Sequence, residues 1–162
     1  MTSLEGLLTA AVLGTGCMSG VFFAFSTFVM AGLVRLPSAQ GIAAMQSINV
    51  KAVRPVFMIA LFGTAALCAV IGVAALFSLE APHPVLMLVG SATYLLGTIL
   101  VTIAGNVPLN NALARLVPGQ PDTARQWRRF VFRWLLFNHV RTLSALGSAA
   151  VFLVALVVSG AP

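Results

Sequence analysis

The feature that most constrains this chain is the length of its uncharged stretches. Lysine, arginine, aspartate and glutamate are all missing from residues 6–34, 55–79, 81–114 and 142–162. Each stretch exceeds the roughly 18 apolar residues that mark a candidate bilayer-spanning helix. The stretches also lack the two-residue alternation of membrane barrel strands. The composition, 60% hydrophobic and 7% charged, is far from that of a soluble domain, in which about 25% of residues are charged.

These stretches predict an all-α fold, a membrane four-helix up-down bundle formed by one integral membrane domain over residues 1–162. The expected transmembrane helices cover about 6–34, 55–79, 84–109 and 134–159. Starting the last helix at 134 accepts Arg141 as a lone charge within it.

The connections carry further signals. In the first connection, Ile42, Met45 and Ile48 recur at helical spacing with polar residues between them, which predicts a short interfacial helix. Trp127 and Trp134 precede or open the last helix, and we expect them to be anchors at the membrane surface.

Apart from Arg141, all lysines and arginines lie in two of the three connections. Residues 35–54 carry Arg35, Lys51 and Arg54, and residues 110–133 carry five arginines against one aspartate. Since lysine and arginine favour cytoplasmic loops, we expect both basic connections in the cytoplasm and both termini outside a bacterial-type inner or plasma membrane. The net charge of +6 is then explained by loops that meet anionic lipid headgroups, so we expect the lipid bilayer and no nucleic acid as a partner.

The apolar helices contain polar side chains near their predicted cytoplasmic ends. In the third helix these residues recur every four positions and so share one stripe: Thr98, Thr102, Asn106 and Asn110. Others lie at the same depth in the first and last helices: Ser26, Asn138, His139, Arg141 and Thr142. Because amides that face lipid lose their hydrogen bonds to water, we expect one polar cluster inside the bundle, covered by Asn49.

Arg141 allows two interpretations. Its side chain leans toward the helix N-terminus, so it could snorkel to lipid phosphates. If it faces inward, no carboxylate of the helices can pair with it, because the three acidic residues are Glu5, Glu80 and Asp122. An inward-facing Arg141 would then contact amides, carbonyls or an anionic ligand, which favours a role in stabilising an anion.

His139 also allows two interpretations. It could hydrogen-bond to a neighbouring helix, or it could act as a general base, since a neutral imidazole accepts a proton. The other histidine, His83, is predicted at the opposite end. Without a second nearby histidine or a carboxylate, the usual zinc and di-iron ligand sets cannot form, so we expect no metal site.

A GxxxG motif, Gly16 to Gly20 in the first helix, favours close packing of two helices. The motif is also compatible with a homodimer.

Four blocks of the chain resemble the anthrone oxygenase family of small four-helix membrane proteins: FFAFSTFVMAGLVRLP, GIAAMQSIN, NVPLNNAL and NHVRT. The resemblance extends from about Gly20 to Leu146, with the blocks in the family's order. The N-x-P-L-N block corresponds to residues 106–110 and the N-H-x-R block to residues 138–141. Phe137 stands where the family often has tryptophan, a mild departure.

The resemblance implies a cofactor-independent oxygenase that oxidises an anthrone-like or other phenolic, polycyclic substrate with dioxygen, with no metal and no organic cofactor. On this basis we predict His139 as the base that abstracts a proton. The residues expected to stabilise the oxyanion are Arg141, Asn106, Asn110 and Asn138. The residues expected to bind the hydrophobic small-molecule substrate are Phe22, Phe23, Ser26, Asn49, Phe137 and Thr142.

A non-catalytic function stays open on the same residues. The polar cluster could bind a quinone, a lipid headgroup or a partner membrane protein without turnover.

Overall fold

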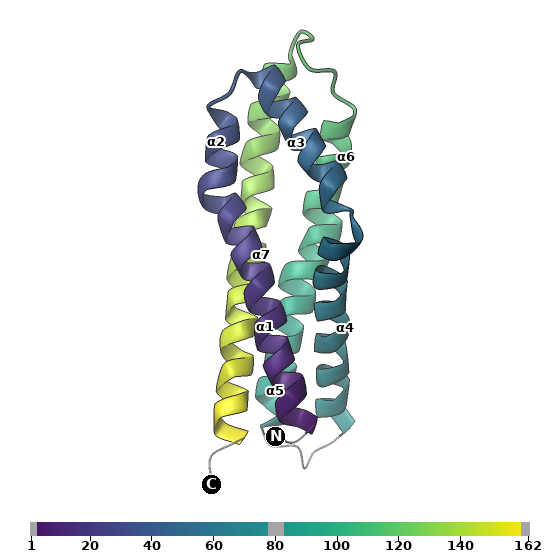
Figure 1. Ribbon diagram of the computed structural model, residues 1–162, viewed down its shortest axis with the longest axis vertical. Helices are drawn as coiled ribbons and strands as arrows, with labels where there is room; N and C mark the ends of the chain where they lie inside the picture. Colours follow the sequence, from purple (N-terminus) through teal and green to yellow (C-terminus); the bar gives the residue numbers. More distant parts are fainter. Residues whose placement is uncertain (1–2, 78–82, 160–162) are drawn as a thin grey trace.

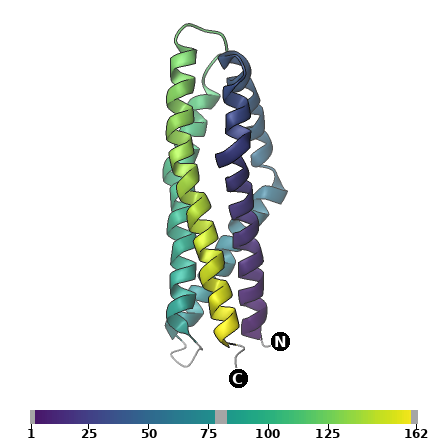
Figure 2. The ribbon, with the colours of Figure 1, turned by 90° about the vertical axis from the view of Figure 1, so that its left-hand side faces the viewer.

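The computed structural model describes residues 3–77 and 83–159, and all regular elements in these ranges are helical. Four helices are long and apolar enough to cross a membrane: Ser3–Val34, Pro55–Phe77, Pro84–Ala114 and Thr123–Ser159. They run up and down in turn, so the first residue of the first helix and the last residue of the fourth lie at one end of the bundle (Figures 1 and 2). The predicted all-α membrane bundle is confirmed.

The long helices are divided by local changes in helical geometry. The first comprises α1 (Ser3–Ala24), the π-helical η1 (Phe25–Val29) and α2 (Met30–Val34). The helix α3 (Ser38–Ala52) crosses the end of the bundle and leads into α4 (Pro55–Phe77) (Figure 1). The third long helix comprises α5 (Pro84–Tyr94), the π-helical η2 (Leu95–Leu100) and η3 (Thr102–Asn106), and α6 (Val107–Ala114). The fourth is α7 (Thr123–Ser159).

Each long helix packs against two others. The helix α1 contacts α4 and α7, and α5 contacts the same two helices. On α7 the buried residues recur every three or four positions and form one stripe: Trp134, Asn138, Arg141, Ala145, Ser148 and Phe152. Leucines on the other faces of α7, such as Leu143 and Leu146, are exposed, as expected where a helix meets acyl chains.

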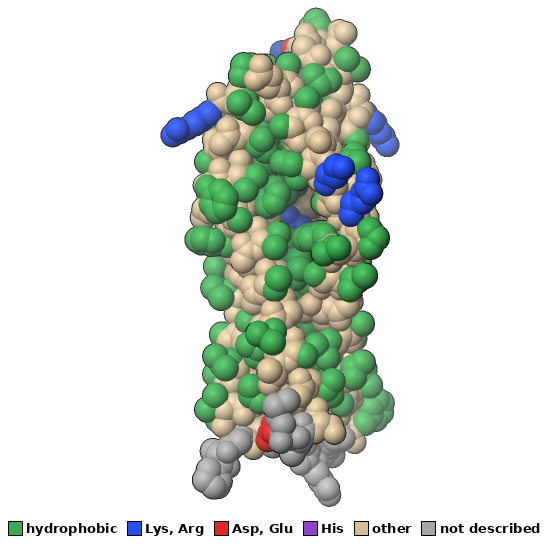
Figure 3. Space-filling view, viewed as in Figure 1, with side chains coloured by type: hydrophobic (Ala, Val, Ile, Leu, Met, Phe, Trp, Pro, Cys, Tyr) green, Lys and Arg blue, Asp and Glu red, His purple; other side chains and the backbone are tan. Residues whose placement is uncertain are grey.

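Two apolar clusters hold the bundle together. The larger lies in the half near the chain ends and includes Leu8, Ile71 and Phe152. The smaller lies under α3, where Met45 packs with Trp127 and other side chains of α7. The charged residues gather at the α3 end of the molecule (Figure 3), as the sequence pattern predicts, whereas Glu5 is in the first turn of α1 at the other end.

The tryptophans and the start of α7 differ from the sequence prediction. The helix begins at Thr123 and so continues well before residue 134, where its transmembrane part was expected to start, and both tryptophans lie on its inner face. Trp127 is 3% and Trp134 5% exposed, so the prediction that they are surface anchors is wrong. They form the base on which Ile42 and Met45 of α3 pack. The predicted short helix in the first connection is therefore present, and it covers the end of the bundle.

The π segments explain why the polar stripe of the third helix stays on the side that faces the inside of the bundle. Four residues of an α-helix turn through about 400°, so a stripe with this spacing drifts by about 40° at each step. A π segment takes more residues per turn, which offsets the drift. Thr98, Thr102 and Asn106 are accordingly all buried, and Asn110 is half-buried.

The helices approach one another closely at glycines outside the predicted GxxxG motif. A Cβ atom at Gly16 or Gly20 would meet nothing within 4 Å, so the motif brings no helices together within this chain. A Cβ at Gly14 would lie 2.6 Å from Thr64 Oγ1, and one at Gly97 would overlap the Ser144 side chain. The close approaches between helices therefore include α1 to α4 at Gly14 and η2 to α7 at Gly97. The homodimer stays a prediction.

Gly97→Ala should destabilise the bundle, because the added methyl group overlaps Ser144 and overpacking costs about 1–3 kcal/mol. Ser144→Gly in the same chain should restore the melting temperature in detergent. The control is Gly63→Ala, where the new Cβ meets nothing within 4 Å. Equal melting temperatures for Gly97→Ala and Gly63→Ala would show that η2 and α7 do not pack as closely as described.

Candidate functional site

A cavity of about 440 Å³ lies between the two apolar clusters. Its walls come from all four long helices and from α3, and are mostly apolar; they include Phe22, Phe25, Met45, Phe57 and Leu61. Of its exposed lining residues, Ser47, Lys51 and Val53 lie at the end of α3 and in the turn to α4, and Val107 begins α6. The cavity therefore opens between that turn and α6. Figure 3 shows a hollow partway along this face, with basic atoms at its bottom.

The guanidinium of Arg141 lines this cavity. Arg141 is 6% exposed, and it is the one buried basic residue in the described ranges 3–77 and 83–159. Its Cζ atom lies 4.3 Å from the centroid of the Phe22 ring and 5.4 Å from that of Trp134. The inward-facing interpretation of Arg141 is therefore the one that the structure bears out, and the guanidinium lies close to two aromatic rings.

Two neutral acceptors hold the guanidinium. Arg141 Nη2 donates to Asn138 Oδ1 at 2.6 Å, and Nη1 donates to Thr102 Oγ1 at 3.3 Å. The Thr102 hydroxyl gives its own proton to the Thr98 carbonyl at 2.6 Å, so it offers Arg141 a lone pair. No carboxylate of residues 3–77 or 83–159 takes part. Such a buried cation carries a desolvation cost that two neutral acceptors only partly offset.

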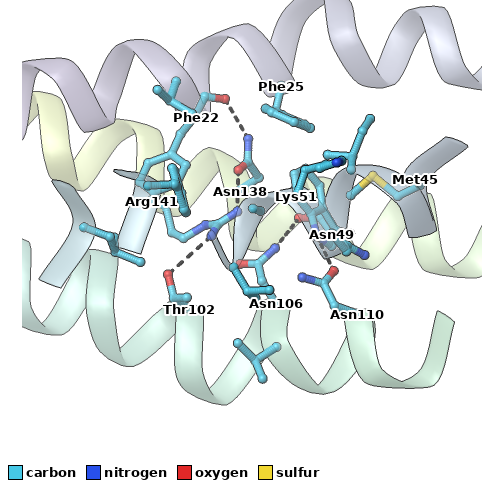
Figure 4. Close-up of a pocket in the computed structure, with 18 of the residues that line it drawn as sticks. Phe22, Phe25, Met45, Asn49, Lys51, Thr102, Asn106, Asn110, Asn138 and Arg141 are labelled. Carbon is cyan, nitrogen blue, oxygen red and sulfur yellow. Dashed lines mark hydrogen bonds between the residues drawn. The ribbon is translucent and has the colours of Figure 1, made fainter. Parts of the chain in front are cut away.

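Asn138 is fixed by its own hydrogen bonds (Figure 4). Its Nδ2 donates to the Phe22 carbonyl and to Ser26 Oγ, both at 2.7 Å. Ser26 Oγ lies 3.3 Å from Thr142 Oγ1, which donates to the Asn138 carbonyl at 2.9 Å. Since each hydroxyl has one proton, Ser26 must donate to Thr142. The amide can therefore present only its oxygen to Arg141.

The insertion of Asn138 also accounts for η1. Its amide bonds to a carbonyl just before the π segment and to a hydroxyl within that segment. A side chain that enters the hydrogen-bond ladder of a helix distorts that helix locally, and π-bulges are frequent at functional sites.

Asn106 and Asn110 both form hydrogen bonds with Trp134, the first residue of the buried stripe on α7. Asn106 Nδ2 donates to the Trp134 carbonyl at 3.3 Å, and Trp134 Nε1 donates to Asn110 Oδ1 at 2.9 Å. Asn110 is therefore engaged with Trp134, whereas Asn106 keeps a carbonyl oxygen for the cavity.

Three buried polar atoms at the cavity have no hydrogen-bond partner among the described residues. They are Arg141 Nε, Asn106 Oδ1 and Asn49 Nδ2. Figure 4 shows their side chains grouped around the same space. Because buried polar groups are nearly always hydrogen-bonded, two donors and one acceptor at the wall of an apolar cavity indicate a site for a ligand that carries oxygen.

His139 does not belong to this site. It is exposed and does not line the cavity, although Asn138 and Arg141 on either side of it are buried. The expectation that the imidazole faces the cavity is wrong, because successive residues of a helix point about 100° apart.

Four of the six predicted substrate-binding residues also lie outside the cavity wall. Phe23 is 57% exposed, and the Phe137 ring packs on the backbone of Gly105, where a Cβ would lie 2.7 Å from it. Ser26 and Thr142 support Asn138 from behind. Phe22 and Asn49 do line the cavity.

Other lining residues were not predicted as part of the site. Thr102 could have been found, because it lies on the polar stripe next to Asn106. Trp134 is four residues before Asn138 and seven before Arg141, a spacing that places it on their face. Lys51 and Phe57 carry no such signal, because their contribution depends on how α3 folds over the bundle.

Within residues 3–77 and 83–159, no group of three or more histidine, cysteine, aspartate or glutamate side chains is placed to hold a metal ion. The polar groups that reach the cavity are instead amides, hydroxyls, the Lys51 ammonium and the Arg141 guanidinium.

The fold and the site define a small helical membrane protein with an apolar cavity around a buried guanidinium. The sequence profile of the anthrone oxygenase family matches residues 55–151, more than half of the chain. The chain therefore belongs to the anthrone oxygenase family, as the sequence resemblance predicts. The matched range includes Asn106 and Arg141, whereas Phe22 and Asn49 precede it. No curated protein and no solved structure matches the chain.

Arg141→Met should leave the melting temperature in detergent unchanged or raise it, because replacing a buried charge with an apolar side chain is often neutral or stabilising. Asn138→Leu should lower stability by about 1–3 kcal/mol, because Arg141 Nη2 loses its acceptor and the Phe22 carbonyl loses the amide that donates to it. His139→Ala, on the exposed face, is the control and should change little. A large loss of stability in Arg141→Met would mean that the arginine serves mainly to hold the fold.

Proposed function

We propose that this protein is a membrane-embedded oxygenase that oxidises an anthrone-like or related polycyclic phenolic substrate with dioxygen, without a cofactor. The observation that carries the proposal is the Arg141 guanidinium, which is buried at an apolar cavity and has two neutral acceptors and no carboxylate. Membership of the anthrone oxygenase family supports the same chemistry.

The cavity suits a flat, mostly apolar ligand. Its volume of about 440 Å³ lies in the range of roughly 300–1,000 Å³ that is typical of small-molecule sites. The Phe22 ring and the Trp134 indole lie close to Arg141 and could stack on an aromatic ligand. A ring oxygen near Arg141 Nε and a hydroxyl near Asn106 Oδ1 would give both unpartnered atoms a hydrogen bond.

In the proposed reaction, the methylene group of the substrate loses a proton, and negative charge collects on the oxygen across the ring. Arg141 stabilises that oxyanion in a site of low dielectric constant, where such stabilisation is strongest. The anion transfers an electron to dioxygen, and the two radicals combine to form a C–O bond. The resulting peroxide anion takes back a proton from water, and the hydroperoxide then loses water, so that CH₂ and O₂ become C=O and H₂O.

The proton acceptor differs from the one expected from the sequence. His139 is exposed outside the cavity, so we do not assign it as the base. We propose that Arg141 acidifies the bound substrate enough for water at the cavity opening to take the proton. Ser47 and Lys51 are exposed at that opening, which makes it the polar exit from the cavity.

We further propose that the end with α3 faces the cytoplasm, with both chain termini outside. Its arginines and lysine support this orientation through the positive-inside rule. The cavity opening would then lie near the inner membrane surface, where an apolar substrate can enter from the bilayer.

Oxygen consumption with dithranol, an anthrone, tests the proposed activity. Arg141→Met should lower turnover about 100- to 1,000-fold, the usual effect of removing an oxyanion donor. Asn106→Leu should weaken binding of the substrate and raise KM. His139→Ala should retain the turnover of the wild type, because its side chain lies outside the cavity.

Turnover that is lost in His139→Ala but kept in Arg141→Met would refute this assignment of roles. Tight binding of a quinone with no oxygen consumption by the folded wild type would favour the non-catalytic function.

A further inference from the structure

A second hollow lies at the basic end, on the outside of the bundle. It has a volume of about 260 Å³ and lies between α7 and the segment formed by α6 and Leu116, two residues beyond the end of α6. One wall is apolar, formed by Leu109, Leu113 and Leu116, with Phe130 from α7. Arg129 and Arg133 line it as well. This combination of a leucine wall and two cations is separate from the cavity around Arg141.

The two arginines are available to an external anion. Arg129 and Arg133 are four residues apart on α7, so they point to one side of the helix. Both are exposed, and neither has an ion-pair partner within residues 3–77 and 83–159. Asp122, the one acidic residue of this connection, already accepts a hydrogen bond from Arg125 at 2.7 Å. Two neighbouring guanidiniums without a counter-ion form a natural phosphate site.

The position along α7 places these arginines where lipid phosphates lie. A helix of 37 residues is about 55 Å long, whereas the hydrocarbon core of a bilayer is about 30 Å thick. One end of α7 must therefore extend beyond the hydrocarbon. Residues 134–159 contain one charge, Arg141, so the hydrocarbon boundary falls close to Arg133.

The apolar wall is firm enough to receive an acyl chain. Leu113 is 1% and Phe130 6% exposed. Phe130 also stacks on Trp127, with ring centroids 5.5 Å apart and an interplanar angle of 14°. Leu113 and Phe130 thus form a firm floor, whereas Leu109 and Leu116 are half-buried and Ala112 is exposed. A free phosphate ion would leave these three side chains in contact with water, whereas a lipid would cover them.

We infer that this groove binds an anionic glycerophospholipid of the surrounding bilayer. Arg129 and Arg133 hold the phosphate of the headgroup, and Leu109, Ala112 and Leu116 contact the first part of an acyl chain. Basic pockets between helices at the cytoplasmic side are known to bind such headgroups. The inference does not depend on the proposed oxidation.

Native mass spectrometry of the full chain in a neutral detergent tests this site, with dioleoyl phosphatidylglycerol and dioleoyl phosphatidylcholine as probes. The wild type should retain phosphatidylglycerol in preference. The double variant Arg129→Gln/Arg133→Gln should bind phosphatidylglycerol roughly tenfold more weakly than the wild type, since both phosphate contacts are lost. Binding of phosphatidylcholine should change little.

The matched control is Arg115→Gln/Arg128→Gln. It removes the same net charge from exposed arginines that do not line the groove, and it should bind phosphatidylglycerol like the wild type. Each single variant, Arg129→Gln and Arg133→Gln, should show an intermediate loss, and circular dichroism would confirm that all variants are helical.

Three results would overturn the inference. Equal losses in the two double variants would show a diffuse effect of charge. Equal binding of the two lipids by the wild type would show no recognition of the anionic headgroup. Displacement of the lipid by millimolar inorganic phosphate would show an anion site to which the acyl chain contributes nothing.

Discussion

The site depends on one interaction, the hydrogen bond by which Asn138 holds the buried guanidinium of Arg141. A cation in an apolar bundle is stable only where its hydrogen bonds are satisfied. Here the acceptors are an amide oxygen and a hydroxyl, so the positive charge is held in place and not neutralised. A carboxylate in either position would fix the arginine more firmly and would leave less of its charge for a ligand.

The surrounding structure serves this arrangement. Ser26 and Thr142 set the orientation of the Asn138 amide. The π segments of the third helix keep Thr102 and Asn106 toward the same space, and α3 covers the end of the bundle and contributes Asn49. These elements are far apart in the sequence, and the cavity forms only where they meet. The groove lined by Arg129 and Arg133 lies on the outside of the same end.

Much of the fold follows directly from the sequence. Uncharged stretches longer than a bilayer is thick permit only long helices, and a buried stripe with four-residue spacing identifies the inner face of the third helix. The same reasoning correctly brings Asn106, Asn138 and Arg141 to one cavity. It does not predict the start of α7 at Thr123, because the five arginines of residues 110–133 resemble a solvated connection although they lie on or beside regular helix. The local π geometry also escapes prediction, because it results from contacts between helices.

The prediction for His139 failed because it was based on the ability of imidazole to accept a proton and not on the direction in which residue 139 points from the helix. Trp134, Asn138 and Arg141 follow one another by four and three residues, which defines one face of α7. His139 is about 100° away from Asn138 on that helix and is exposed. Judged by its position around the helix, Trp134 belongs to the site. It was expected to be a surface anchor because it is an aromatic residue next to arginine. The position of His139 around the helix is thus more informative than the frequency with which histidine serves as a base.

The central claim is that Arg141 presents its positive charge to an anion in the apolar cavity. The most direct measurement is a spectrophotometric pH titration of a bound hydroxyanthraquinone, whose neutral and ionised forms absorb at different wavelengths. In the wild type the bound phenol should ionise about one to three pH units lower than in Arg141→Met, the usual effect of a neighbouring opposite charge. Binding with the same ionisation midpoint in both proteins would contradict the claim, because the guanidinium would then have no influence on the ligand.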